Sequence, residues 1–119
     1  MKLLTVEQHA RLLANGKANN ARRDDGLDEI DHKPVVKLFT PDAGCTWLLT
    51  EIDPDEPDIA FGLCDLGLGF PELGNVSLGE LATVRGKLGL PVERDRWFKA
   101  DKPLSAYAEE ARRLEAIRT

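Results

Sequence analysis

The apolar positions near the N-terminus recur every three to four residues, the spacing that places side chains on one face of a helix. The stripe consists of Val6, Ala10 and Leu13. Thr5 followed by Gln8 is a capping-box pattern, and Gly16 suits a helix end, so a helix is predicted over residues 5–16. The polar, turn-prone residues 15–33 that follow indicate a long loop.

Two further helices are predicted in the second half of the chain. Ser77 and Glu80 form a capping box that begins one of them, and Gly89 with Pro91 would end it. Its core-facing residues are expected to be Leu81, Val84 and Leu88. The last helix is expected over about residues 104–118, because apolar residues recur there at spacings of three and four. These residues are Leu104, Tyr107, Ala108, Ala111, Leu114 and Ile117.

The middle of the chain is rich in β-branched and aromatic residues, which favours strands. Thr46–Ile52 and Ile59–Asp65 flank an acidic stretch with two prolines, which predicts a hairpin with a stiff tip. Residues 35–39 and 92–98 are expected to add further strands. The order of these elements predicts one α+β domain over residues 1–119: a twisted, mainly antiparallel sheet with about three helices packed on one face.

Composition narrows the class of protein. The 119 residues carry 21 acidic and 16 basic side chains, and this net charge of −5 argues against a general nucleic-acid binder. No apolar run is long enough to span a bilayer, and the chain turns polar directly after Leu4, so we expect a cytoplasmic protein without a membrane partner. In that compartment Cys45 and Cys64 are expected to stay reduced.

The chain lacks the sequence signatures of the common chemistries. A dinucleotide-binding pattern on Gly67 and Gly69 would need a third glycine where Glu72 stands, so we interpret the glycines as turn and close-packing residues. His9 and His32 belong to no metal-binding motif, and no serine lies in a nucleophile elbow. We therefore expect no cofactor, no metal and no enzymatic activity, with an unrecognised small enzyme as an alternative.

Five carboxylates fall within eight residues at the predicted hairpin tip. They are Glu51, Asp53, Asp55, Glu56 and Asp58. One interpretation is a solvated turn that keeps the protein soluble. The other is a negative patch that binds a protein partner with a basic surface.

A basic and aromatic segment offers a second binding surface. Its residues are Arg94, Arg96, Trp97, Lys99 and Lys102. Cations beside an aromatic ring can bind single-stranded nucleic acid, with the ring stacking on a base. The alternative is a core aromatic with ordinary salt bridges, because the adjacent Trp97 and Phe98 would point to opposite faces of a strand.

Several motifs together resemble a known family. They are Phe61-Gly62-Leu63-Cys64-Asp65-Leu66-Gly67-Leu68-Gly69, Pro71-Glu72-Leu73-Gly74, Val76-Ser77-Leu78 with Glu80-Leu81, Leu88-Gly89-Leu90-Pro91-Val92-Glu93-Arg94-Asp95 and Lys102-Pro103-Leu104-Ser105. This set is similar to domain-of-unknown-function family 2958 and covers about residues 3–112. The resemblance implies a small bacterial protein of conjugative plasmids and integrative elements, and it supplies no catalytic residues. Asn75 stands where the family pattern favours an aromatic residue.

These observations lead to three hypotheses about function. The first is a non-enzymatic accessory protein of a mobile genetic element that binds another protein, in its sharpest form a counter-defence (anti-restriction or anti-CRISPR) inhibitor. The second is a single-stranded nucleic-acid-binding accessory of conjugation or DNA processing. The third is the small enzyme mentioned above.

Overall fold

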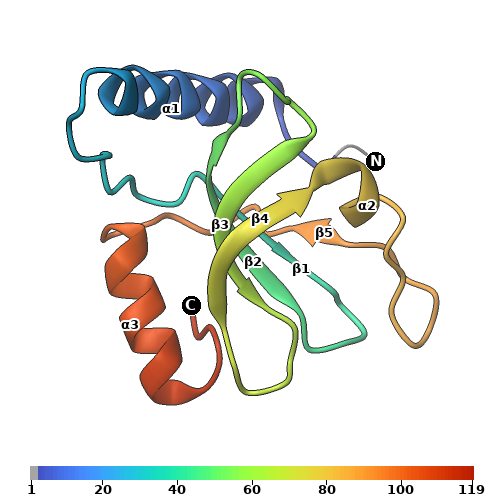
Figure 1. Cartoon of the computed structure of the whole chain (residues 1–119). Helices are drawn as coiled ribbons and strands as arrows, with labels where there is room; N and C mark the ends of the chain where they lie inside the picture. Colours follow the sequence, from blue (N-terminus) through green and yellow to red (C-terminus); the bar gives the residue numbers. More distant parts are fainter. Residues whose placement is uncertain (1–2) are drawn as a thin grey trace.

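The computed structural model describes residues 3–119, which form three helices and a five-stranded sheet (Figure 1). In chain order the elements are α1 (Val6–Asp24), β1 (Val36–Phe39), β2 (Thr46–Ile52), β3 (Ile59–Asp65), β4 (Glu72–Ser77), α2 (Leu78–Leu81), β5 (Glu93–Arg94) and α3 (Leu104–Leu114). The strands lie in the order β4-β3-β2-β1-β5, and every neighbouring pair is antiparallel. The α+β class and the β2–β3 hairpin are therefore confirmed.

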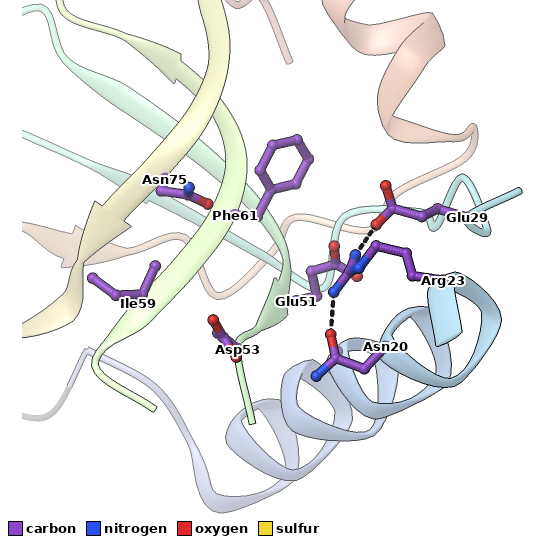
Figure 2. Close-up of a pocket in the computed structure, with 9 residues that line it drawn as sticks. Asn20, Arg23, Glu29, Glu51, Asp53, Ile59, Phe61 and Asn75 are labelled. Carbon is purple, nitrogen blue, oxygen red and sulfur yellow. Dashed lines mark hydrogen bonds and ion pairs between the residues drawn. The ribbon is translucent and has the colours of Figure 1, made fainter. Parts of the chain in front are cut away.

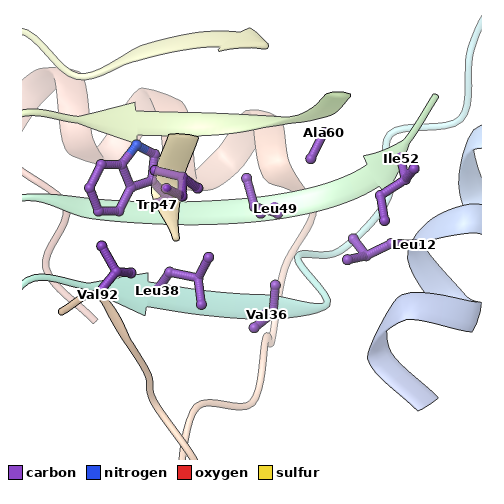
Figure 3. Close-up of a cluster of buried hydrophobic side chains, with 9 residues drawn as sticks. Leu12, Val36, Leu38, Trp47, Leu49, Ile52, Ala60 and Val92 are labelled. Carbon is purple, nitrogen blue, oxygen red and sulfur yellow. The ribbon is translucent and has the colours of Figure 1, made fainter. Parts of the chain in front are cut away.

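The two faces of the sheet carry separate hydrophobic clusters. On one face Leu12 of α1 packs with side chains of the three central strands (Figure 3), and Leu81 of α2 joins the same cluster. On the other face Leu48 and Leu63 pack against the apolar side of α3. The expectation that all helices cover one face is thus corrected for α3, because alternate residues of the central strands are apolar on both faces.

Helix α1 continues for two more turns than its sequence pattern predicts, and residues 15–24 are helical instead of a loop. Gly16 does not end the helix; it lets the helix approach the sheet. A Cβ at Gly16 would lie 1.8 Å from the Ile52 carbonyl oxygen, so only glycine fits there. The side-chain amide of Asn15 also donates to the Thr50 carbonyl at 2.9 Å, which holds this part of α1 on the sheet.

Residues 25–34 form an extended connection that ties α1 to α3. The buried side chain of Asn19 accepts from the Ile30 N–H at 2.6 Å and donates to the Ile30 carbonyl at 3.2 Å. Asp31 caps α3 by accepting from the backbone N–H and the hydroxyl of Ser105. The polar residues that suggested a long loop therefore hold an ordered segment in place.

Helix α2 is a single turn, shorter than predicted. The Ser77 hydroxyl caps it by accepting from the Glu80 N–H, as the sequence indicated. Beyond Leu81 the chain forms a loop, and Asp42 holds that loop by accepting from the N–H groups of Leu88 and Leu90. Leu88 is 80% exposed and contributes nothing to the core, which corrects its predicted role.

The remaining differences concern the β4 and β5 strands and the end of α3. Strand β4 was not predicted, because Gly74 and Asn75 both disfavour strands. The strand expected over residues 92–98 is reduced to the two residues of β5. Helix α3 stops at Leu114, where Glu115 takes a left-handed conformation with φ of 62°.

Candidate functional site

A polar cavity, here called the Glu51 cleft, has a volume of about 310 Å³. It lies between the second half of α1, the end of β2 and the β3–β4 pair, on the α3 face of the sheet (Figure 2). Its lining residues are Gly16, Asn20, Arg23, Glu29, Glu51, Asp53, Ile59, Phe61 and Asn75. Three carboxylates and one guanidinium thus share a cavity at the lower end of the size range of ligand pockets.

A β-bulge aims Glu51 into the cleft. The β2–β3 register shifts between Leu49 and Glu51, so Thr50 is the extra residue on β2. The shift pairs Glu51 with Phe61, and Phe61 pairs in turn with Asn75 on β4. Paired residues of antiparallel strands lie on the same face, so these three side chains form one row across the sheet. Bulges commonly redirect a side chain in this way at functional sites.

Hydrogen bonds from two side chains hold the bulge and the Glu51 carboxylate in place. The Thr50 hydroxyl donates to the Phe61 carbonyl at 3.3 Å. The side-chain amide of Asn19, itself only 2% exposed, donates to the Glu51 Oε2 atom at 2.8 Å. Asn19 therefore connects α1, the 25–34 segment and the Glu51 carboxylate, and it fixes the direction of that carboxylate.

Arg23 is the cation of the cleft, and it is already held by its neighbours. Its guanidinium pairs with the carboxylate of Glu29 and donates to the side-chain oxygen of Asn20 (Figure 2). In residues 3–119 neither Glu51 nor Asp53 takes part in an ion pair. The cleft thus has spare negative charge on its β2 side.

Burial is the main reason that the pKa of Glu51 is raised above its ordinary value. The hydrogen bond from Asn19 opposes the rise, and the nearby carboxylate of Glu29 adds to it. The nearby side chains of His32 and Arg23 oppose the rise further. The ionised form of Glu51 is therefore less favourable in the folded protein than in water, and an incoming cation would relieve this cost.

We predict that Glu51→Gln is at least as stable as the native protein at pH 7. Because the pKa of Glu51 is raised, its stabilising contribution is complete below about pH 4.3, the ordinary pKa of a glutamate, and is lost as pH rises through the raised value. Glutamine keeps the oxygen that Asn19 needs and has no charge to desolvate. The gain should stay below about 1 kcal/mol, because solvent screens this half-buried group.

Thermal unfolding followed by circular dichroism at pH 7 and pH 4 tests this prediction. The gain should be present at pH 7 and absent at pH 4, where the native Glu51 is largely protonated. Glu56→Gln removes the same charge from an exposed position of the same hairpin and serves as the control. A Glu51→Gln variant that melts below the native protein at pH 7 would contradict the assigned cause of the shift.

The five carboxylates of the predicted tip are separated by the fold. Glu51 and Asp53 line the cleft, Glu51 partly buried and Asp53 exposed, whereas the exposed Asp55 and Glu56 of the β2–β3 loop do not line it. Asp58 accepts from the Ser77 hydroxyl and from the Gly79 N–H at 2.8 Å, and these bonds lower its pKa. Asp58 therefore helps to hold the start of α2, and only Glu51 and Asp53 of the five contribute carboxylates to the cleft.

Sequence reasoning missed Arg23 as a cleft residue. It was assigned to a loop because the helix was expected to end at Gly16, and the longer α1 brings it to the cleft. Glu29 does lie outside the helix, in the 25–34 segment, and its pairing with Arg23 could not be foreseen. A signal was available in the basic pair Arg22 and Arg23, since cations are favoured in the last turn of a helix.

The basic and aromatic segment is also divided between structural and exposed roles. Arg94 donates to the Leu3 carbonyl at 3.1 Å. Lys102 pairs with Glu110 at 2.7 Å and lies over the ring of Tyr107. Trp97 is 91% exposed beside Lys99, at a hollow of about 550 Å³, and Arg96 is exposed as well. The neighbouring Phe98 packs on the α3 cluster, as one of the two aromatic residues was expected to do.

The cysteines, the potential metal ligands and the hydrophobicity of the helices assign no activity to the protein. Cys45 and Cys64 are free thiols, and burial raises the pKa of Cys64. The part of the chain that the structure describes holds no group of three or more His, Cys, Asp or Glu side chains suited to a metal ion. None of the helices within residues 3–119 is both long and apolar enough to cross a membrane.

Comparison with known proteins gives one match. A family model described as "Protein of unknown function (DUF2958)" matches residues 3–118, nearly the whole chain. This match confirms the resemblance that the sequence motifs suggested. No curated protein and no solved structure matches the chain.

Proposed function

Because the chain belongs to the DUF2958 family, whose function is unknown, we propose from the geometry that it is a non-enzymatic protein that binds another protein through the Glu51 cleft. The observation that carries the proposal is the spare negative charge of the cleft. Glu51 and Asp53 face a cavity of about 310 Å³, and in the described residues neither takes part in an ion pair.

A lysine or arginine side chain of the partner matches this cavity. The Glu51 and Asp53 carboxylates can accept its hydrogen bonds, and a guanidinium can stack on the Phe61 ring at the cleft wall. Charge-assisted hydrogen bonds of this kind are about twice as strong as neutral ones. Net charge of −5 would also favour encounter with a basic surface and repel acidic ones.

We also propose where this binding takes place and what kind of partner is bound. The family resemblance implies a mobile genetic element, and proteins that bind nucleic acid present basic surfaces. A partner of that kind would make the protein a counter-defence inhibitor, of the anti-restriction or anti-CRISPR type, that covers a nucleic-acid-binding surface.

A nuclear magnetic resonance titration with a small cationic probe tests the chemistry of the cleft. The probe is the capped tripeptide Gly-Arg-Gly, and Gly-Glu-Gly is its control. We expect the arginine peptide to bind in the millimolar range, about −4 kcal/mol, and to shift the resonances of Glu51, Phe61 and Asn75. Added salt should weaken binding, because it screens the carboxylates. Equal shifts with the glutamate peptide, or shifts confined to other surfaces, would refute cation binding in the cleft.

Exposed Trp97 favours a second candidate function, the binding of single-stranded nucleic acid. Its indole lies open to solvent beside Lys99, and the hollow next to it also holds Phe98 and Tyr107. An aromatic ring beside cations is the arrangement on which unpaired bases stack, with about 1–3 kcal/mol per base. Asp95, Asp101 and Glu110 line the same hollow and weaken its attraction for phosphate, so we rank this candidate second.

Tryptophan fluorescence separates the two candidates, because the other tryptophan, Trp47, is only 4% exposed. If the second candidate holds, oligo(dT) should quench the emission of Trp97 at low salt and lose this effect steeply as salt rises. The Trp97→Phe variant should show no quenching. Absence of quenching in the native protein at low salt would remove this candidate.

A further inference from the structure

A group of exposed apolar side chains, here called the loop patch, lies at the β3–β4 loop and extends along β4 toward the Glu51 cleft. Its residues are Leu66, Leu68, Phe70, Leu73 and Leu114, from the β3–β4 loop, β4 and the end of α3. Leu68 and Phe70 are 74% and 80% exposed, and both line a hollow of about 500 Å³. Concentrated apolar exposure of this kind marks interaction surfaces in soluble proteins.

The loop that presents these side chains has a fixed shape. Gly67 and Gly69 adopt φ angles of 78° and 86°, which other residues rarely adopt. The buried carboxylate of Asp65 accepts from the Gly67 N–H at 2.9 Å, so the turn is anchored at its base. The exposure of Leu68 and Phe70 therefore follows from an anchored turn.

Strand β4 borders the loop patch and is an open edge of the sheet. It pairs with β3 on one side and has no strand on the other (Figure 1). In residues 3–119 no hydrogen bond outside the sheet involves the backbone of residues 72–76, so their outward N–H and C=O groups are free to pair. The strand contains no lysine and no proline, the residues that commonly protect such edges.

The spacing along β4 connects the loop patch to the cleft. Leu73 and Asn75 are two residues apart, so both side chains lie on the α3 face, about 6.8 Å from each other along the strand. Leu73 belongs to the loop patch, and Asn75 lines the cleft. A strand that pairs with β4 would place two of its own side chains, two residues apart, opposite Leu73 and Asn75, one at the loop patch and one at the cleft.

We propose that the edge of β4 binds an extended segment of the protein partner by strand addition, with an apolar side chain on the loop patch and a lysine or arginine two residues along at the cleft. This inference rests on the proposed function and defines the shape of the ligand. The cation would extend over Asn75 toward the ring of Phe61, and the carboxylate of Glu51 lies beyond that ring in the same row.

The charge of this chain favours a different protein, and not a second copy of this chain, as the partner that pairs with the β4 edge. A second copy would carry the same net charge of −5 and bring its own Glu72 and Glu115 to the edge. The carboxylates beside β4 instead complement a basic segment. In strand addition the main-chain hydrogen bonds supply affinity, and alternate side chains supply specificity.

A capped hexapeptide, Thr-Val-Thr-Arg-Thr-Val, is the probe, since its valine and arginine are two residues apart. We expect it to shift the β4 resonances, slow the exchange of the outward β4 amides, and bind about tenfold more tightly than Gly-Arg-Gly. Replacing its third residue by proline, or its arginine by glutamate, should abolish these effects. Unchanged amide exchange in β4 at saturation would overturn the inference.

Variants of the protein provide the second arm of the test. Leu73→Lys and Phe70→Ser should each weaken the hexapeptide about tenfold, and circular dichroism checks that both still fold. Leu88→Ser removes a leucine that is as exposed as Phe70 from a different loop and should leave binding unchanged.

Three outcomes would overturn the inference in distinguishable ways. If both peptides shift the cleft but neither protects β4, strand addition fails while the proposed function stands. If neither peptide binds, both fail. A native dimer in sedimentation that Leu73→Lys dissociates would assign the edge to a second copy.

Discussion

Replacing Gly62 by alanine is expected to destabilise the protein by about 3 kcal/mol or more. A Cβ at this position would lie 2.0 Å from the carbonyl oxygen of Leu48 and 2.8 Å from the Cα of Leu49. Both contacts are with backbone atoms of β2, whose leucines are fully buried on opposite faces of the sheet. Close-packed interiors cannot yield by such an amount, so the cost should exceed that of ordinary overpacking.

Gly74 provides a matched control, because it is the cross-strand partner of Gly62 on β4. A Cβ at Gly74 would meet no atom within 4 Å. Gly74→Ala should therefore be neutral or stabilising by up to about 1 kcal/mol, since alanine reduces the freedom of the unfolded chain. Urea unfolding of both variants measures the contrast. Similar losses for the two variants would show that the β2–β3 approach is not as close as described.

The sequence predicts the centre of the fold well, because there each local signal agrees with the packing. Strands β2 and β3 have the bounds that their β-branched and aromatic residues indicate. The Ser77 cap also forms where its pattern places it. The apolar face of α3 is buried at Leu104, Tyr107, Ala108 and Ala111, as the spacing indicates.

The prediction fails where a long-range contact reverses a local preference. Gly16, Asn15 and Asn19 each disfavour the interior of a helix, and together they suggested a helix end. In the structure all three serve the contact with β2 or with the 25–34 segment, which offsets their poor propensity. No local rule contains this information, because the partners are up to 36 residues away in the sequence.

In the candidate site, too, the sequence predicts the features set by local signals and misses those set by long-range contacts. The acidic cluster drew attention to Glu51 and Asp53, which line the cleft, but it could not show that they lie apart from Asp58. The decisive feature is the bulge at Thr50, which turns Glu51 to the face of Phe61. If Thr50 were paired like an ordinary strand residue, strand alternation would place Glu51 on the face of Leu49.

The second large effect concerns binding: the double variant Glu51→Gln with Asp53→Asn should lose the protein partner. Both changes keep the side-chain shape and one acceptor oxygen each. They remove the two carboxylate charges, neither of which takes part in an ion pair in the described residues. Loss of one side of a desolvated charge pair costs about 2–5 kcal/mol at protein interfaces. We therefore expect affinity to fall at least about tenfold, the equivalent of 1.4 kcal/mol.

The matched control is Asp55→Asn with Glu56→Gln. It removes the same number of charges from the same hairpin, at two exposed positions that do not line the cleft. A general effect of net charge would weaken both double variants equally. A specific role of the cleft would weaken only the first.

Capture of the tagged protein's partners from a host lysate, with the native protein and both double variants and after nuclease treatment, tests the central claim most directly. The account predicts a specific protein that survives nuclease, is retained by Asp55→Asn/Glu56→Gln, and is lost with Glu51→Gln/Asp53→Asn. A partner that the cleft variant retains at native yield, or a partner set that disappears with nuclease, would contradict it.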